Sequence, residues 1–177
     1  EAGAAALPPG GEGLVFLPYL MGERSPIWDA QASGAFVGLG LHHGRFHLYR
    51  AVLEGVTYAL QHNIETGARG SAPLDAELTV VGGAARSDLW MQMIADITRR
   101  PVNTIPGDVE ASLGAAMLAA LAVGLADTDA LFEHWVKLEP RARPREQEAG
   151  RYARLYRQYV ASYPALRDVM HALKSLA

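Results

Sequence analysis

The segment from residue 78 to residue 97 constrains the fold of this chain more than any other. A short apolar run, Leu78 to Val81, leads directly into Gly82-Gly83-Ala84-Ala85, and Ser87 follows. From there apolar residues recur with the i, i+3, i+4, i+7 spacing of an amphipathic helix. These residues are Trp90, Met93, Ile94 and Ile97. The segment therefore predicts a strand, a tight glycine turn and a helix.

Two interpretations of this turn follow from the residues alone. Paired glycines allow a sharp turn and leave the backbone amides of Gly82 and Gly83 uncovered by side chains. A helix that begins just behind them adds unpaired N–H groups and the positive end of its dipole, which suit an anion or a flat ring. A short strand-to-helix connection with no ligand explains the same residues, since such loops often contain glycine.

Composition narrows the classes of protein to which the chain can belong. Its 177 residues carry a net charge of −3, which is not the electrostatic footprint of a nucleic-acid-binding protein. It has no cysteine, which suits a reducing cytoplasm and excludes thiol chemistry. No apolar run approaches the roughly 20 residues of a membrane span. We therefore expect a cytoplasmic protein with neither nucleic-acid nor membrane partners.

The remaining pattern predicts an α/β domain. Strands are expected at 14–20, 35–39 and 102–105, and helices at 48–64, 109–123 and 152–173, the last broken or bent at Pro164. The strand–helix–strand order from 78 to 105 requires a parallel pair with a right-handed crossover. Residues 1–13 are rich in Ala, Gly and Pro and look like a flexible linker or a truncated start.

Three groups of side chains have simple structural interpretations. The arginines from 141 to 157 are mixed with glutamates, which is typical of a solvated face. The histidines His42, His43 and His47 lack a converging set of further ligands, so no metal site is predicted. The tyrosines of the C-terminal helix recur at helical spacing, which favours packing over binding; they are Tyr152, Tyr156, Tyr159 and Tyr163.

Four motifs, in order along the chain, resemble the C-terminal domain of FGGY-type carbohydrate kinases, with xylulose kinases most similar, gluconate kinases next and glycerol kinases further off. The strings are LPYLMGERSPIWD, GAFVGLGLHHGRFHLYRAVLEGVTYAL, VVGGAARSDLWMQMIADITRRPVNTI and EASLGAAMLAALAVG. The resemblance covers about residues 14–165. It implies that 14–177 form the C-terminal nucleotide-binding domain of an actin-like, ribonuclease-H-like ATPase fold, without the first strands of that domain.

The resemblance also implies where the nucleotide lies. Gly82, Gly83, Ala84 and Ser87 match the family's adenosine motif, which places ATP, used with Mg²⁺, at this turn. Ser87 is equally suited to cap the following helix. Glu23 and Arg24 match a Gly-Glu-Arg-x-Pro motif and are expected to pair and fix their loop.

Function follows from the same resemblance. The parent protein is expected to transfer the γ-phosphoryl group of ATP to a hydroxyl of a ketopentose such as xylulose. A gluconate or other polyol kinase of the same family, and a non-catalytic actin-like module that binds nucleotide or a partner, are the alternatives. Glu54 matches a charged position of the family's long helix, with a solvated or hinge-facing role.

Part of the catalytic machinery is expected outside this chain. The family places its general-base aspartate and most of its sugar contacts in preceding segments, so no catalytic residue and no metal ligand is assigned here. The chain alone is predicted to be inactive. With its sheet short of neighbouring strands, we also expect it to associate as a homodimer.

Overall fold

The computed structural model describes residues 1–70, 74–107 and 110–176. Within these residues the helices are α1 (Ala2–Ala5), α2 (Arg45–Ala68), α3 (Asp88–Thr98), α4 (Glu110–Ala122), α5 (Thr128–Trp135) and α6 (Glu146–Lys174), with a 3₁₀ turn, η1, at Gly83–Arg86. The strands are β1 (Val15–Leu17), β2 (Ala35–Val37), β3 (Leu78–Thr79), β4 (Val102–Thr104) and β5 (Glu139–Ala142). The α/β class expected from the sequence is confirmed.

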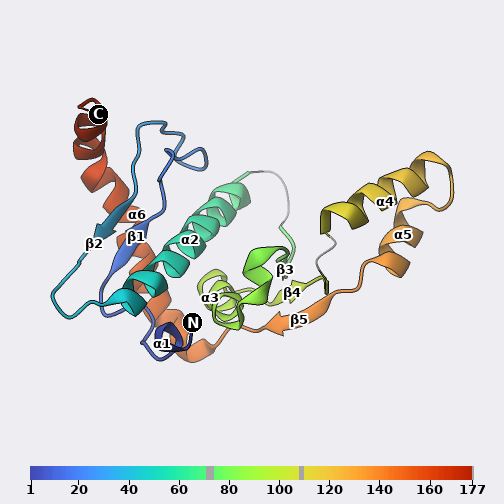
Figure 1. The fold of residues 1–177 in the computed structure, drawn as a ribbon, viewed down its shortest axis with the longest axis horizontal. Helices are drawn as coiled ribbons and strands as arrows, with labels where there is room; N and C mark the ends of the chain where they lie inside the picture. Colours follow the sequence, from blue (N-terminus) through green and yellow to red (C-terminus); the bar gives the residue numbers. More distant parts are fainter. Residues whose placement is uncertain (71–73, 108–109, 177) are drawn as a thin grey trace.

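Two small sheets organise the described part of the chain. β1 and β2 pair antiparallel, whereas the second sheet has the order β3-β4-β5. β3 and β4 are parallel, with Leu78 opposite Val102, which confirms the parallel pair predicted around α3. β5 runs antiparallel to β4 and was not predicted. Figure 1 shows α2, α3 and α6 gathered beside these strands, while α4 and α5 extend away as a separate arm.

The main core lies between α2, α3, α6 and β1. α2 contacts both β1 and α3, and α6 contacts α3 and β1. Tyr152 and Tyr159 are 2% and 0% exposed there, so the predicted packing role of the tyrosines is confirmed for both. The other buried members of this cluster are Val15, Leu17, Tyr19, Ala32, Leu53, Tyr58, Met93, Ile97 and Met170.

Helix boundaries agree with the sequence where local signals mark them. α3 begins after Ser87 and ends at Thr98, and Arg99, with a φ of 60°, caps it in the left-handed region ahead of Pro101. α4 ends just before Gly124, as predicted, although Val109, its expected first residue, lies outside the described residues. α6 continues as one helix through Pro164, so a break there is wrong, and a bend, the other alternative, stays a prediction. Packing of residues on both sides of Pro164, such as Tyr159 and Met170, offsets the hydrogen bond that the proline cannot donate.

Residues 1–13 pack against the rest of the structure, in contrast to the flexible start expected from their composition. α1 contacts α2, and Ala4 is fully buried. The Gly10 N–H donates to the Glu54 carboxylate at 2.9 Å. Specific contacts therefore hold this segment in place, which its Ala-, Gly- and Pro-rich composition did not indicate. The domain boundary at residue 14 stays a prediction.

Candidate functional site

The glycine turn lies at the carboxyl end of β3, where open α/β sheets place ligands. Gly82 has φ 79° and ψ −156°, a conformation that side chains with a Cβ strongly disfavour. Gly83 then starts η1, and the Ala85 N–H donates to the Gly82 carbonyl at 3.1 Å. This geometry explains why the sequence needs a glycine at 82, and it exposes the backbone of 83.

The space in front of this turn is open. A Cβ added at Gly82 or at Gly83 would meet no heavy atom within 4 Å. Beside the turn lies a hollow of about 540 Å³. Its walls come from the turn, the start of α3, the end of β4 and β5: Gly82, Ala85, Arg86, Asp88, Thr104, Ile105, Pro106, Gly107, Glu139 and Arg141. The corner therefore has both bare backbone and room for a ligand.

Ser87 caps α3, one of the two roles expected for it. Its Oγ accepts a hydrogen bond from the Trp90 N–H at 3.0 Å and donates to the carboxylate of Glu1. The cap satisfies one of the N–H groups that a helix leaves unpaired at its start. Ala84, between Gly83 and Ser87, lies within η1. The sequence-predicted residues Gly82, Gly83, Ala84 and Ser87 are thus brought together in one turn.

Trp90 anchors the start of α3 to the core. Its indole Nε1 donates to Thr57 Oγ1 at 3.0 Å, and Thr57 in turn donates to the Leu53 carbonyl at 2.7 Å. Thr57 is 1% exposed on α2. The helix whose N-terminus borders the hollow is therefore fixed to the buried side of α2.

Arg141 contacts the turn from the other side. It donates to the Ala85 carbonyl at 2.7 Å and to the Asp88 carboxylate at 2.6 Å. Arg145, a few residues on, binds the buried Asp96 carboxylate at 2.7 Å, and this hydrogen bond raises the arginine's pKa. Both arginines remain solvent-exposed, as expected of a solvated face, and each also pairs with an acidic side chain on α3.

The prediction of a solvated Glu54 is wrong, whereas the hinge-facing alternative stays a prediction. The Glu54 side chain is 1% exposed and accepts from Arg50 Nε at 2.8 Å and from Tyr152 OH at 3.2 Å. Burial raises the pKa of Glu54, and the charge of Arg50 opposes that shift. Arg50 also donates to the carbonyls of Ala4 and Leu7 at 3.0 and 2.7 Å. The pair closes a polar network between α2, α6 and residues 1–13.

The loop after β1 is held from within and by α6. Glu23 accepts from the Ser25 N–H at 3.0 Å rather than pairing with Arg24, so the expected pair is not formed in the described part of the chain. Asp29 accepts from Tyr163 OH at 2.6 Å and from His171 Nε2 at 2.7 Å. The hydrogen bond from His171 is the largest cause, and that from Tyr163 the next, of a pKa of Asp29 well below its ordinary value.

The histidines near residue 45 are held by local contacts. His43 Nδ1 accepts from the Gly40 N–H and His47 Nδ1 from the Gly44 N–H, at 2.8 and 3.0 Å. His47 Nε2 lies 3.4 Å from the Glu12 carboxylate. In a neutral imidazole whose Nδ1 accepts a hydrogen bond, the proton is on Nε2. Neither ring nitrogen then offers a free lone pair to a metal ion. Across residues 1–70, 74–107 and 110–176, no group of three His, Cys, Asp or Glu side chains suits a metal ion.

Sequence reasoning missed the residues that complete the hollow. Thr104, Glu139 and Arg141 come from the end of β4 and from β5. β5 has no alternating apolar pattern and contains Pro140, so nothing local marks it as a strand.

None of the helices in the described ranges is long and apolar enough to span a membrane.

A bare glycine turn at the carboxyl edge of parallel strands, in front of a capped helix, is characteristic of α/β domains that bind nucleotides or other anionic ligands. Comparison with known proteins makes the assignment specific. Residues 1–123 match the C-terminal domain of the FGGY family of carbohydrate kinases, and the chain belongs to this family.

Individual relatives agree with this assignment. The chain is 33% identical over 174 residues to a xylulose kinase of Bacillus subtilis, covering 98% of the chain and 35% of the relative. It is 37% identical over 161 residues to a gluconokinase of Bacillus licheniformis, covering 90% of the chain and 31% of the relative. The chain therefore spans about a third of the length of these curated relatives.

A solved structure gives the same result for the fold. The crystal structure of xylulose kinase from Rhodospirillum rubrum matches 96% of this chain, and 34% of its own chain is covered. The TM-score is 0.79 and the sequence identity 37%. The structure is thus a C-terminal portion of the actin-like ATPase fold of these sugar kinases, as the sequence motifs implied.

Proposed function

We propose that this chain is the ATP-binding C-terminal part of a kinase that transfers the γ-phosphoryl group of ATP to a hydroxyl of a ketopentose such as xylulose. Membership of the FGGY family and the xylulose kinases among the relatives support this function. The gluconokinases among the relatives favour gluconate or another polyol as the second candidate substrate. A non-catalytic module is disfavoured, because these relatives are named as kinases.

The observation that carries the proposal is the open glycine corner. Gly82, Gly83, Ala84 and Ser87 are proposed to contact the adenosine part of ATP. With no heavy atom within 4 Å of a Cβ built at Gly83, a base or ribose can lie directly against the backbone. The N-terminus of α3, capped by Ser87, presents the positive end of its dipole to the same space.

This chain contributes binding and orientation. ATP, once bound, supplies the phosphoryl group, and the α3 N-terminus with the Gly82–Arg86 turn fixes where its adenosine end lies. Phosphoryl transfer also requires an acceptor hydroxyl and a base in line with the phosphates. The sugar site and the general-base aspartate are proposed to lie in other parts of the parent protein. Mg²⁺ belongs to the same proposal, but no ligand for it is assigned among the described residues. A cytoplasmic location stays a prediction.

Substitution of Gly83 by valine tests the site. Gly83→Val places a branched side chain in the space proposed for the ribose or base, and the open surroundings let the unliganded chain keep its fold. In titration calorimetry of the 177-residue chain with ATP, we expect binding to weaken by tenfold or more, equal to about 1.4 kcal/mol or more. In the full-length parent the KM for ATP should rise correspondingly.

Gly67→Val is the matched control. Gly67 lies near the exposed end of α2 and also has no heavy atom within 4 Å of an added Cβ. It should leave the affinity for ATP unchanged. Equal affinities of the Gly83→Val and wild-type chains, with both folded, would show that the motif is a strand-to-helix connection that binds no nucleotide.

A further inference from the structure

Arg141 occupies an unusual position in the sheet beside the proposed nucleotide site. In the antiparallel pairing of β4 with β5, Val102 lies opposite Ala142, and Asn103 lies opposite Pro140. One step along β4 thus corresponds to two steps along β5, so that Arg141 is the extra residue of a β-bulge. Bulges re-aim a side chain and are frequent next to active sites.

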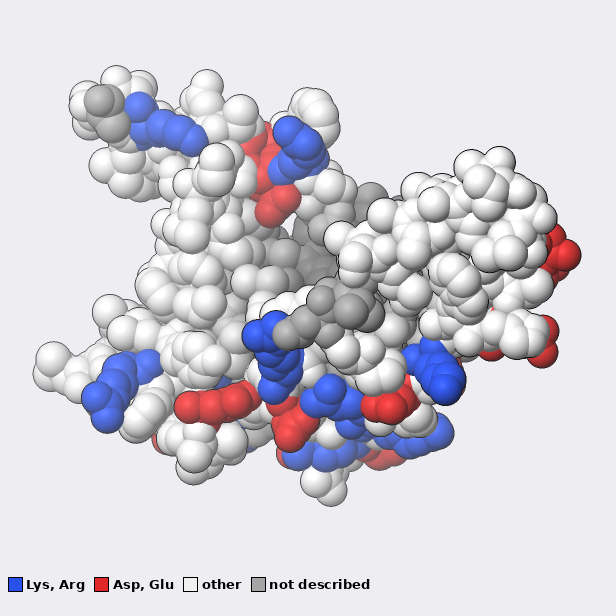
Figure 2. Space-filling view, turned by 45° about the vertical axis from the view of Figure 1, so that its right-hand side comes forward, with Lys and Arg blue, Asp and Glu red and all other residues white. Residues whose placement is uncertain are grey.

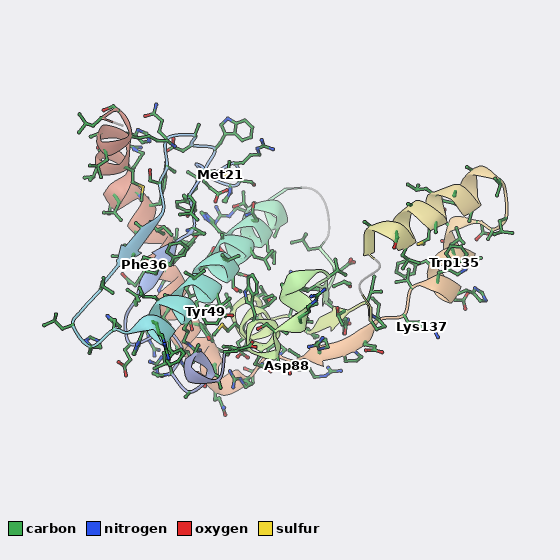
Figure 3. The ribbon with its side chains drawn as sticks, viewed as in Figure 1. Met21, Phe36, Tyr49, Asp88, Trp135 and Lys137 are labelled. Carbon is green, nitrogen blue, oxygen red and sulfur yellow. The ribbon has the colours of Figure 1, made fainter. Side chains whose placement is uncertain are left out.

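The bulge directs the guanidinium onto the nucleotide turn. One nitrogen of Arg141 donates to the carbonyl of Ala85, which is 9% exposed within η1. Another donates to the carboxylate of Asp88, the first residue of α3. A planar guanidinium makes the two bonds from two nitrogens held in a fixed fork, whereas a lysine has a single ammonium nitrogen on a flexible stem. A single side chain therefore links β5, the turn and the start of α3, and Figure 3 shows Asp88 at this end of α3, alongside β5.

The two contacts differ in weight. The Asp88 side chain is 94% exposed and that of Arg141 is 27% exposed, so water screens their ion pair, which contributes little. The bond to the Ala85 carbonyl is partly buried and reaches the backbone of the turn itself. We expect the carbonyl contact to dominate.

We propose that Arg141 is a positioning residue for nucleotide binding, which holds the Gly82–Arg86 turn in the conformation that accepts adenosine. This inference rests on the proposed function of the same turn. Gly82 and Gly83 give the unbound backbone more freedom than other residues would, and ordering it on binding costs free energy. By fixing the turn beforehand, Arg141 reduces that cost. It lies outside residues 1–123, which match the family domain.

The first experiment needs no ligand. In the wild-type chain the N–H groups of Ala85 and Ser87 donate within the turn, to the carbonyls of Gly82 and Ala84. Hydrogen exchange at these two amides should be several-fold faster in the Arg141→Gln chain, because the turn loses its support. Arg143→Gln is the control, since within the described residues Arg143 accepts at its carbonyl, from Gln92, and its guanidinium makes no hydrogen bond to the turn. Unchanged exchange at both amides would overturn the inference whatever the ligand proves to be.

The second experiment measures binding. Titration of the 177-residue chain with ATP and, separately, with adenosine should show a roughly tenfold loss for both ligands in Arg141→Gln. Arg141→Lys, which keeps the charge but lacks the rigid two-nitrogen fork, should fall between this variant and the wild type. Asp88→Asn retains the carbonyl contact and should lose less than Arg141→Gln, while Arg143→Gln should match the wild type.

The outcomes separate the two proposals. If the wild-type chain binds both ligands and Arg141→Gln binds them equally well, Arg141 does not position the turn. A loss for ATP alone would indicate a direct phosphate contact and overturn a positioning role. If the wild-type chain binds neither ligand, the proposed site itself is wrong, while the exchange experiment still decides whether Arg141 orders the turn.

Discussion

Two arginine–carboxylate pairs show how differently two regions of this molecule use charge. Arg50 and Glu54 on α2 are 4% and 1% exposed at their side chains, and they join three segments of the core. Arg141 and Asp88, at the turn beside β5, are 27% and 94% exposed. A buried pair is costly to break because it leaves an unpaired charge, whereas an exposed pair contributes little to folding. The first pair thus maintains the fold, and the second is free to serve a site.

The strongest challenge to this comparison would be catalysis by the chain alone. The region around the Gly82–Arg86 turn is proposed to hold only the adenosine end of ATP. Asp88 and Asp96 are paired with arginines, and Asp29 accepts from Tyr163 and His171, so none of these three is placed as a free base. With ATP, Mg²⁺ and a panel of ketoses and polyols, we expect no sugar phosphate above a no-protein control.

Full-length kinases typically turn over at roughly 1–100 s⁻¹. A coupled assay for ADP detects far slower rates, and the full-length parent provides its positive control. Turnover of the 177-residue chain at an ordinary kinase rate would show that the base and acceptor site lie within it. The division between a packing region and a binding region would then be wrong.

Breaking the buried pair should cause the largest change in stability. Glu54→Ala leaves the Arg50 guanidinium buried without its carboxylate and frees the Gly10 N–H. We expect the free energy of unfolding to fall by about 3–5 kcal/mol, measured by urea denaturation. Glu65→Ala is the control on the same helix, because Glu65 is half-buried and accepts from Tyr156 and Gln61 near the surface. Equal losses in the two variants would contradict the special weight given to Glu54.

Part of this arrangement could be predicted from the sequence. The unit from β3 to β4 has a local signal at each boundary: glycines at the turn, Ser87 at the helix cap and Pro101 after the helix. The strand, turn and helix predicted for the glycine motif are therefore confirmed, and nucleotide contact at that turn stays a proposal. Glycine turns, helix caps and prolines are reliable local signals because they act on the conformation of the nearby backbone.

The rest could not be predicted, because distant contacts decide it. Glu54 was expected in a solvated or hinge-facing role, and its burial depends on Gly10 and Tyr152, which are remote in the sequence. Likewise Glu139–Ala142 becomes a strand only because β4 offers it an edge. The charged character of Arg50 and Arg141 was visible, but the partners that give each its role were not.

A third region of the molecule, around α4, exposes apolar side chains. Several apolar side chains of α4 and of the segment after it are exposed, including Leu118 at 69%, Val123 at 79% and Leu125 at 69%. Figure 2 shows an almost uncharged face on the lobe formed by α4 and α5. Contiguous apolar surface favours association. We expect the isolated chain to form a dimer or larger species.

Light scattering coupled to size exclusion, at several protein concentrations, measures this association. Leu118→Glu is expected to shift the equilibrium toward monomer, whereas Glu133→Gln on α5 should not. A monodisperse wild-type monomer with a cooperative thermal transition would show that these residues form a closed domain, and that the exposed apolar surface of α4 does not drive association.

The smallest expected effect concerns acid stability at the loop that α6 holds. Hydrogen bonds from His171 and Tyr163 keep the pKa of Asp29 below its ordinary value of 3.8. A carboxyl whose pKa is lower in the folded than in the unfolded state stabilises the fold above its unfolded pKa. This contribution should therefore be complete at pH 5 and above, and should decline as the pH falls below about 4.

Asp29→Asn removes the titrating group and isolates this contribution. At pH 6 the variant should melt below the wild type, and as the pH falls from about 5 to about 2 the difference between them should shrink, because the wild type alone loses the charge-assisted bonds. Asp168→Asn, at a side chain that is 86% exposed on α6, should keep a constant offset from the wild type across the same range. A difference between Asp29→Asn and the wild type that stays constant with pH would show that Asp29 supports the loop through hydrogen-bond geometry alone. Asp29, with 12% of its side chain exposed, would then act as a structural carboxylate like the buried Glu54, and not as a solvated one like Asp88.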